Sequence, residues 1–160
     1  MTRTVEALLL DIRSAHNVGA MFRTADCAGI QRIHLSGYTP SPMDEFGRLR
    51  ADIAKTALGA IETVSWDRLE DVVAQIATWK EGGMQVIALE QDAQSTDYRR
   101  VPLSERVVFI VGNEVEGIPR AVCDMADVVV SIPCRGEKES LNVASAFSVA
   151  AYAFTDEDHS

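Results

Sequence analysis

Cysteine is scarce in this chain, and no two cysteines stand at a spacing that binds zinc. The 160 residues contain three cysteines, which are far apart and include no CxxC pair: Cys27, Cys123 and Cys134. An odd number of separated cysteines with no CxxC pair suggests neither a disulfide framework nor a zinc site. We expect these thiols to be reduced and mostly buried. The three histidines show no ligand spacing either, so no metal is expected.

Long hydrophobic runs are also missing. The longest strongly apolar segment, Leu141 to Phe154, falls short of the roughly 20 residues that a membrane helix requires. The opening residues, MTRTVEALLLD, contain no signal-peptide cleavage site. We therefore expect a soluble, cytoplasmic protein with no membrane partner.

Three common nucleotide and hydrolase motifs are absent. The chain has no GxGxxG fingerprint and no GxxxxGK phosphate loop. It also lacks the GxSxG nucleophile elbow on which a Ser-His-Asp hydrolase would depend. These absences make an unrelated doubly wound nucleotide-binding enzyme the weakest of the functional alternatives.

Positive charge is in short supply, since the formal net charge is −9. Phosphate binding is driven by counterion release at Lys and Arg clusters, so this balance argues against nonspecific coating of nucleic acid. The first third of the chain nevertheless contains several basic residues: Arg3, Arg13, Arg23, Arg32, Arg48, Arg50 and Lys55. They leave open a local basic face or an ordinary solvated surface.

The pattern of apolar residues predicts one α/β domain over residues 1–155, followed by an acidic tail, 156–160, that we expect to be disordered. Apolar runs without alternation indicate strands covered on both faces, hence a mostly parallel sheet flanked by helices. Strands are predicted at 6–12, 32–36, 85–90, 107–112 and 127–133, helices at 17–30, 66–80, 119–125 and 140–154, and a long loop at 37–52.

Polar residues follow the predicted strands, at the edge where open parallel sheets bind ligands. The first such segment, NVGAMFR, places Asn17 near a helix cap, Gly19 for close approach and Arg23 two turns further on. A capped helix with a surface arginine is the plainer interpretation. The second, GNEVEG at 112–117, combines glycines with Glu114 and another carboxylate, which suit a cofactor or a simple solvated turn.

The third segment, IPCRGEKESLN, lies between a predicted strand and the last helix. Ser140 is the predicted N-cap, and Asn142 adds a side-chain amide in the first turn. Backbone donors at such a terminus favour an anionic or carbonyl group of a ligand. The last helix is apolar or small nearly all round, so we expect more than its own sheet to cover it.

Together the segments NVGAMFRTA, VVFIVGNEVEGI and SIPCRGEKESLNVASAFSVAAYAF resemble those of the SpoU-type, or TrmH-like, RNA 2′-O-ribose methyltransferases of the α/β-knot (SPOUT) superfamily. The resemblance spans nearly the whole chain. It implies a fold that topology rules would have argued against, in which the C-terminal segment threads through a loop to form a deep trefoil knot.

The resemblance also implies a cofactor and a dimer. S-adenosylmethionine would lie in the knot, against the residues that match the family's cofactor-binding positions: Leu89, Glu90, Gly112, Asn113, Glu114, Ile132, Cys134, Ser140 and Leu141. A homodimer with the site at the subunit interface would cover the apolar last helix. No metal is required.

The implied catalytic residues are Arg23, Asn17, Glu114, Ser140 and Asn142. Deprotonating an arginine at pH 7 would cost roughly 7 kcal/mol, so we expect Arg23 to grip the target phosphate and stabilise alkoxide charge. Glu114, Ser140 or a phosphate oxygen would receive the proton. Asn17 and Asn142 would hold loop geometry or contact the ribose.

The RNA partner is expected to be tRNA rather than rRNA. The chain starts almost directly at its first predicted strand, so recognition would depend on the knot domain and its dimer mate, which favours a compact structured target. The alternative is a noncatalytic RNA-binding or assembly factor that keeps the knot fold.

Overall fold

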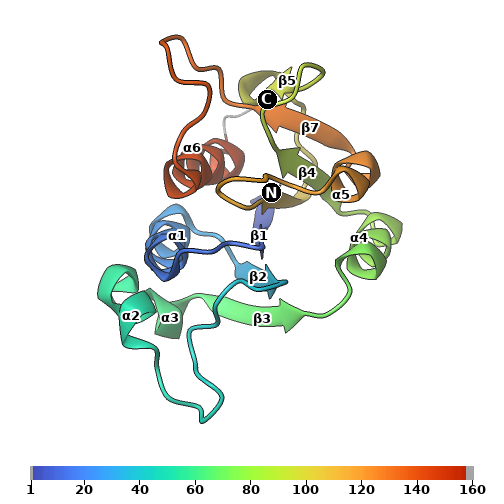
Figure 1. The fold of residues 1–160 in the computed structure, drawn as a ribbon. Coiled ribbons are helices and arrows are strands. Elements are labelled where there is room, and N and C mark those ends of the chain that lie inside the picture. The colour runs from blue at the N-terminus through green and yellow to red at the C-terminus, as the bar shows by residue number, and fades with distance from the viewer. Residues whose placement is uncertain (1, 158–160) are drawn as a thin grey trace.

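The computed structural model describes residues 2–157, and they form one parallel sheet between two layers of helices (Figure 1). The sheet has seven strands in the order β3-β2-β1-β6-β4-β7-β5, and every neighbouring pair is parallel. The strands are β1 (Thr4–Leu10), β2 (Arg32–Ser36), β3 (Ser65–Leu69), β4 (Gln85–Leu89), β5 (Thr96–Asp97), β6 (Arg106–Val111) and β7 (Val128–Ser131). The expectation of a mostly parallel α/β sheet is confirmed.

Helices cover both faces of the sheet. One face carries α1 (Ala15–Ala28), α2 (Ala51–Ala57), α3 (Ala60–Thr63) and α6 (Val143–Thr155); the other carries α4 (Val72–Glu81) and α5 (Arg120–Met125) (Figure 1). A single 3-10 turn, η1 (Tyr98–Arg100), follows β5. None of the helices within residues 2–157 has the length and apolar character needed to cross a membrane.

The core lies on both sides of the central strand β6. Phe109 points toward the α1 and α6 layer, where its ring lies 5.2 Å from that of Phe147 and 5.5 Å from that of Phe154. Val108 and Ile110 point the other way, into the cluster under α4 and α5. Successive side chains of a strand alternate between faces, so a strand buried on both faces shows the unbroken apolar run seen at 107–111.

The predicted helix at 66–80 is wrong over its first residues. Ser65–Leu69 forms β3 and pairs in parallel with β2. The helix starts only after Asp71, whose carboxylate accepts a hydrogen bond of 3.0 Å from the Ala74 backbone N–H. Leu69 and Val72 fit a helical spacing, but the N-cap at Asp71 and the free edge of β2 decide the local structure.

Two short helices, α2 and α3, were not predicted. They follow the long loop expected at 37–52, whose last residues already belong to α2. Helices of seven and four residues are too short to show a sustained apolar period, so only their packing stabilises them.

The cysteines differ from the sequence-based expectation, and part of the acidic tail lies within the described residues. All three thiols are free, but Cys27 is exposed and Cys123 and Cys134 are only partly buried, so the expectation that they are mostly buried is wrong. In the tail, Asp156 holds Arg3 through its carbonyl oxygen at 2.9 Å. Residues 158–160 lie outside the described part of the chain.

The close approach of α1 and α2 depends on Gly19. A Cβ at this position would lie 2.0 Å from Thr56 Oγ1 and 2.3 Å from the Ile53 carbonyl oxygen. The same hydroxyl donates a 3.0 Å hydrogen bond to the His16 carbonyl oxygen. The sequence-based expectation that Gly19 permits a close approach is confirmed, and the element it admits is α2.

We predict that Gly19→Ala lowers the free energy of unfolding by about 1–3 kcal/mol, because an added methyl group in a packed interface forces backbone shifts. Urea denaturation of the variant at pH 7 measures the loss. Gly136→Ala is the matched control, since a Cβ there meets nothing within 4 Å. Equal stability of the two variants would contradict the proposed close approach.

Candidate ligand pocket at the carboxyl edge of the sheet

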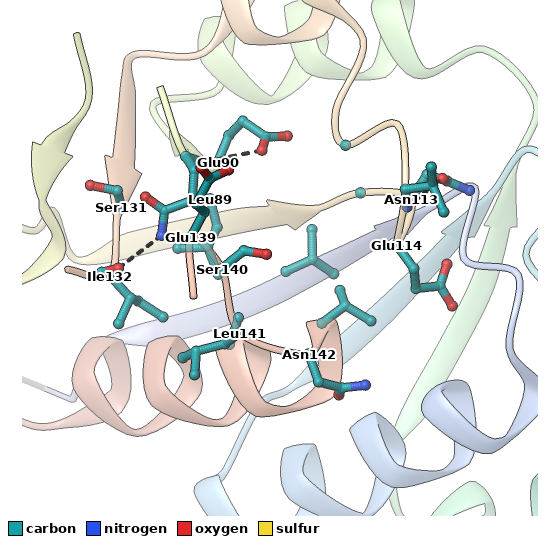
Figure 2. A pocket seen from close by; sticks show the side chains of 17 residues that line it. Leu89, Glu90, Asn113, Glu114, Ser131, Ile132, Glu139, Ser140, Leu141 and Asn142 are labelled. Carbon is teal, nitrogen blue, oxygen red and sulfur yellow. Dashed lines mark hydrogen bonds between the residues drawn. The ribbon is translucent and has the colours of Figure 1, made fainter. Parts of the chain in front are cut away.

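A pocket of about 520 Å³ opens where β4, β6 and β7 end (Figure 2). These strands are neighbours in the sheet, so their carboxyl ends meet at one edge. The walls come from residues 89–91, 111–115, 131–132 and 139–143, with Gly117 and Ala146. Three segments far apart in the sequence thus converge on one cavity, as the strand-end pattern predicts.

The wall after β6 is a tight turn that requires glycine at Gly112. The backbones of Asn113 and Gly117 bond to each other in both directions, at 3.2 and 3.0 Å. A Cβ at residue 112 would lie 2.6 Å from the Gly117 carbonyl carbon and 2.7 Å from the Ile118 nitrogen. Gly117 has a φ of 71°, which other residues rarely adopt. The two glycines therefore shape the pocket wall.

Asn113 is buried, and its side chain joins this turn to the segments that follow β1 and β2. Its Nδ2 donates to the Asp11 carbonyl oxygen at 2.9 Å and to the Tyr38 hydroxyl, while its Oδ1 accepts from the N–H groups of Val115 and Glu116 at 2.8 Å. All the hydrogen-bonding capacity of the amide is used within the protein. Asn113 thus holds the wall in place.

Glu114 connects the pocket to the start of α1. One carboxylate oxygen accepts from the Arg13 backbone N–H at 2.9 Å; the other accepts from the Ser14 N–H at 3.0 Å and from Asn17 Nδ2 at 3.2 Å. Partial burial opposes ionisation, but the hydrogen bonds from Arg13 and Ser14 outweigh it, and the pKa of Glu114 lies below its ordinary value. The carboxylate is ionised at neutral pH.

The wall after β4 is tied to both other walls. Glu90 accepts from the Ile118 N–H at 2.7 Å, and Gln91 Nε2 donates to the Ile132 carbonyl oxygen at 2.8 Å (Figure 2). The sequence analysis missed Gln91, and also the lining residues Val111, Val115, Ser131, Glu139, Val143 and Ala146. No local pattern marks Gln91, because its partner is reached only through the fold.

The predicted N-cap of the last helix is wrong by two residues. Asn142, not Ser140, precedes α6, and its Oδ1 accepts from the N–H groups of Ala144 at 2.9 Å and Ser145 at 3.3 Å. Ser140 is exposed and lines the pocket instead. An asparagine is as good an N-cap as a serine, so residue type alone could not separate the two.

The structure brings most of the predicted site residues together. The pocket is lined by Leu89, Glu90, Gly112, Asn113, Glu114, Ile132, Ser140, Leu141 and Asn142. Cys134 does not line it, although its thiol lies 3.6 Å from the Ile132 carbonyl oxygen. Asn17 reaches the site through its bond to Glu114.

Arg23 lies elsewhere. It lines a second hollow, of about 560 Å³, between α1, α2 and α6, together with His16, Lys55 and Tyr152. Its side chain projects from the outer surface of α1, and it is exposed. Within one chain, Arg23 therefore does not share a cavity with the predicted cofactor-binding residues. Among the residues that the structure describes, no group of three or more His, Cys, Asp or Glu side chains could hold a metal ion.

Fold and pocket together define an α/β protein with a candidate ligand pocket at the carboxyl edge of a parallel sheet. Residues 5–152 match the model of the SpoU rRNA Methylase family. This match covers most of the chain, and the protein belongs to that family.

Relatives with names and structures support this assignment. The chain is 33% identical over 138 residues to the 23S rRNA (guanosine-2′-O-)-methyltransferase RlmB of Neisseria meningitidis, covering 86% of this chain and 52% of that protein. An AdoMet-bound rRNA methyltransferase of Sinorhizobium meliloti superposes with a TM-score of 0.83 at 28% identity, covering 95% and 56% of the two chains.

A second similar structure, described as giving insights into the 2-OH methylation of C/U34 on tRNA, has a TM-score of 0.76 at 26% identity, and the match covers 94% of this chain and 93% of that one. The chain spans about half the length of the curated relatives it matches, 52% for the Neisseria protein.

We predict that Glu114→Gln destabilises the fold at pH 7, because a neutral amide is a weaker acceptor for the α1 N–H groups. The native pKa of Glu114 is lowered from 4.5, so its contribution is complete above about pH 4.5 and disappears as pH falls through the native value. Urea midpoints of both proteins between pH 7 and pH 3 should therefore converge. Glu116→Gln, a change at an exposed neighbour, is the control; a gap independent of pH would contradict the prediction.

Proposed function

We propose that the protein is an S-adenosylmethionine-dependent RNA methyltransferase that modifies a ribose 2′-hydroxyl. The observation that carries the proposal is the pocket itself, in which the ends of β4, β6 and β7 converge around a glycine-shaped turn in a chain of the SpoU family. The names of the relatives support the reaction, and the AdoMet-bound relative supports the cofactor.

The residues present fit this cofactor. A volume of about 520 Å³ lies within the range of small-molecule sites. The turn that forms the wall after β6 closes only because residue 112 has no Cβ to meet Gly117 and Ile118. Leu89, Ile132 and Leu141 offer apolar contact, while the Glu90 carboxylate and Ser140 hydroxyl offer hydrogen bonds. When bound, S-adenosylmethionine supplies an electrophilic sulfonium methyl group.

The C-terminal third is proposed to be knotted, as the superfamily resemblance implies. The chain leaves β7, forms the loop 132–142 against the pocket and returns as α6 to pack on α1, β1 and β6. Such a path suits a threaded segment, because the loop that comes last in the sequence then closes over the two pocket walls that follow β4 and β6.

Glu114 is proposed to position the reacting groups rather than to accept the proton. Its lowered pKa and its three hydrogen bonds to the start of α1 make it a weak base. The 2′-hydroxyl proton then passes to solvent, with the Ser140 hydroxyl or a phosphate oxygen of the substrate relaying it, because neither group keeps an added proton at pH 7. Asn17 is held by Glu114 at the same end of the pocket, where it would orient the ribose, and Asn142 fixes the start of α6.

The protein is proposed to act as a homodimer with a composite site. Arg23 lies outside the pocket of its own chain, in the hollow between α1, α2 and α6. A second copy on this surface would cover the exposed side chains of Leu58 and Tyr152 and bring Arg23 of the partner subunit toward the pocket. There the guanidinium would grip the target phosphate and stabilise alkoxide charge.

The substrate is proposed to be tRNA. One similar structure, at 26% identity and a TM-score of 0.76, is described as giving insights into the 2-OH methylation of C/U34 on tRNA, and this supports the proposal. A cytoplasmic location is proposed together with this substrate.

The test is to incubate the protein with methyl-labelled S-adenosylmethionine and, separately, total tRNA and rRNA, and to map any 2′-O-methylated nucleotide. We expect label in tRNA, and we expect Gly112→Ala to abolish both cofactor binding and transfer because the turn cannot close. Gly136→Ala should keep both. Cofactor binding without transfer to either RNA would favour the noncatalytic assembly factor.

We further predict that Arg23→Ala and Arg23→Lys weaken RNA binding and slow single-turnover transfer, with Lys less affected because it keeps the charge but not the bidentate fork. Mixing Arg23→Ala subunits with Gly112→Ala subunits should restore part of the activity, since each mixed dimer holds one intact composite site. If mixed dimers form but stay inactive, the proposal of a composite site is wrong. If the Arg23 variants bind RNA more weakly but transfer the methyl group at an unchanged single-turnover rate, only the stabilisation of alkoxide charge is contradicted.

A further inference from the structure

An exposed aromatic side chain, Tyr38, lies beside the pocket and is held at both ends. It follows β2 at the carboxyl edge of the sheet and is 57% exposed. Its backbone N–H donates to Asp11 Oδ1 at 3.2 Å, and its hydroxyl accepts from Nδ2 of the buried, pocket-lining Asn113. A surface tyrosine bonded at both ends loses little further freedom when a ligand covers its ring.

The charges around the ring favour a neutral base over a phosphate. Asp11, Glu114 and Glu116 all lie near enough to act on the Tyr38 hydroxyl, as does Arg13. Burial of the hydroxyl, followed by the Asp11 carboxylate, raises the pKa of Tyr38, so the ring stays uncharged. Three carboxylates would repel a phosphate placed on the ring, whereas a base carries no charge.

Arg13 offers a separate place for the phosphate. Its backbone N–H donates to the carboxylate of the pocket-lining residue Glu114, which fixes Arg13 at the same end of the pocket. Its side chain is exposed, and within residues 2–157 its guanidinium makes no hydrogen bond or salt bridge. By contrast, Arg48 and Arg50 pair with Asp44 and Asp52 at 3.0 and 2.7 Å. A free guanidinium in an acidic chain is available to a phosphate.

We infer that Tyr38 and Arg13 form a nucleotide-binding platform, on which the ring stacks against an unpaired RNA base beside the target nucleotide and the guanidinium binds a phosphate of the same strand. The inference rests on the proposed function, which it deepens by naming how the strand lies at the Glu114 end of the pocket. Aromatic faces stack on bases of any sequence, which suits a contact to an unpaired loop.

The chain supplies a matched control in a second aromatic–arginine pair. Phe46 is 72% exposed, with the Arg48 guanidinium 4.9 Å from its ring centroid. This pair lies in the loop before α2, and neither residue lines the pocket. If any exposed aromatic–arginine pair could bind RNA, variants of Phe46 and Arg48 would weaken RNA binding as well. If the position beside the pocket matters, only variants of Tyr38 and Arg13 would weaken it.

The experiment measures the affinity of the full-length protein for poly(U) and for total tRNA over a salt series, with S-adenosylmethionine affinity measured in parallel. We expect Tyr38→Ala to weaken RNA binding by about tenfold and Tyr38→Phe to keep it. Arg13→Gln should reduce the slope of log affinity against log salt by about 0.7, the value for one single-strand phosphate. Phe46→Ala and Arg48→Gln should bind RNA like the parent, and cofactor affinity should stay constant in these two variants and in Arg13→Gln. Tyr38→Ala and Tyr38→Phe both lose the bond to Asn113, so they should have the same cofactor affinity as each other.

The inference is overturned if Tyr38→Phe loses as much affinity as Tyr38→Ala, because the bond to Asn113 would then carry the effect. It is also overturned if the Phe46 and Arg48 variants lose as much, or if the parent protein binds neither RNA. Platform-dependent binding without methyl transfer would support the inference and contradict the proposed enzyme activity, so the two failures are distinguishable.

Discussion

The pocket depends on the buried side chain of Asn113. Its amide donates to the ends of two neighbouring segments, at Asp11 and Tyr38, and its carbonyl accepts from the turn that it begins. A buried amide left without partners costs about 1–3 kcal/mol, so the turn and the two strand ends form as one unit. The turn that faces the cavity after β6 is therefore positioned by Asn113.

The next residue extends the same constraint to a helix. Glu114 binds the first N–H groups before and at the cap of α1, so the helix and the pocket wall share one carboxylate. α1 also carries Arg23 on its outer side, so the helix that Glu114 binds lies between the pocket and the surface proposed for the second subunit. The proposed cofactor site, substrate platform and dimer surface thus adjoin segments that Asn113 and Glu114 hold in place.

The local signals of the sequence were strongest where a strand is buried on both faces. The predicted strand at 107–112 is observed at Arg106–Val111, and that at 32–36 is observed without change. They failed where the pattern was short or ambiguous. Ser65–Leu69 was predicted as part of a helix but forms an edge strand. Ser140 was predicted as the N-cap of the last helix, but the helix starts two residues later and Asn142 caps it.

The candidate site could be located but not assembled from the sequence. Glycines and polar residues after apolar runs marked the loops at 112–117 and 132–142, and most of the predicted residues there line the cavity. Gln91 was missed because its partner, Ile132, is 41 positions away. The sequence did not reveal that Arg23 lies outside the pocket, because the position of a residue along a helix does not specify which cavity its side chain lines.

The sequence by itself determined the parallel α/β class, the strand ends that carry chemistry and the glycines of the pocket turn. These properties follow from burial on two faces and from backbone geometry, which act on neighbouring residues. Only the tertiary structure decided the strand order, the bond between Tyr38 and Asn113 across 75 positions and the separation of Arg23 from the pocket. Such contacts depend on which strands lie side by side, and this order is set by packing of the whole sheet.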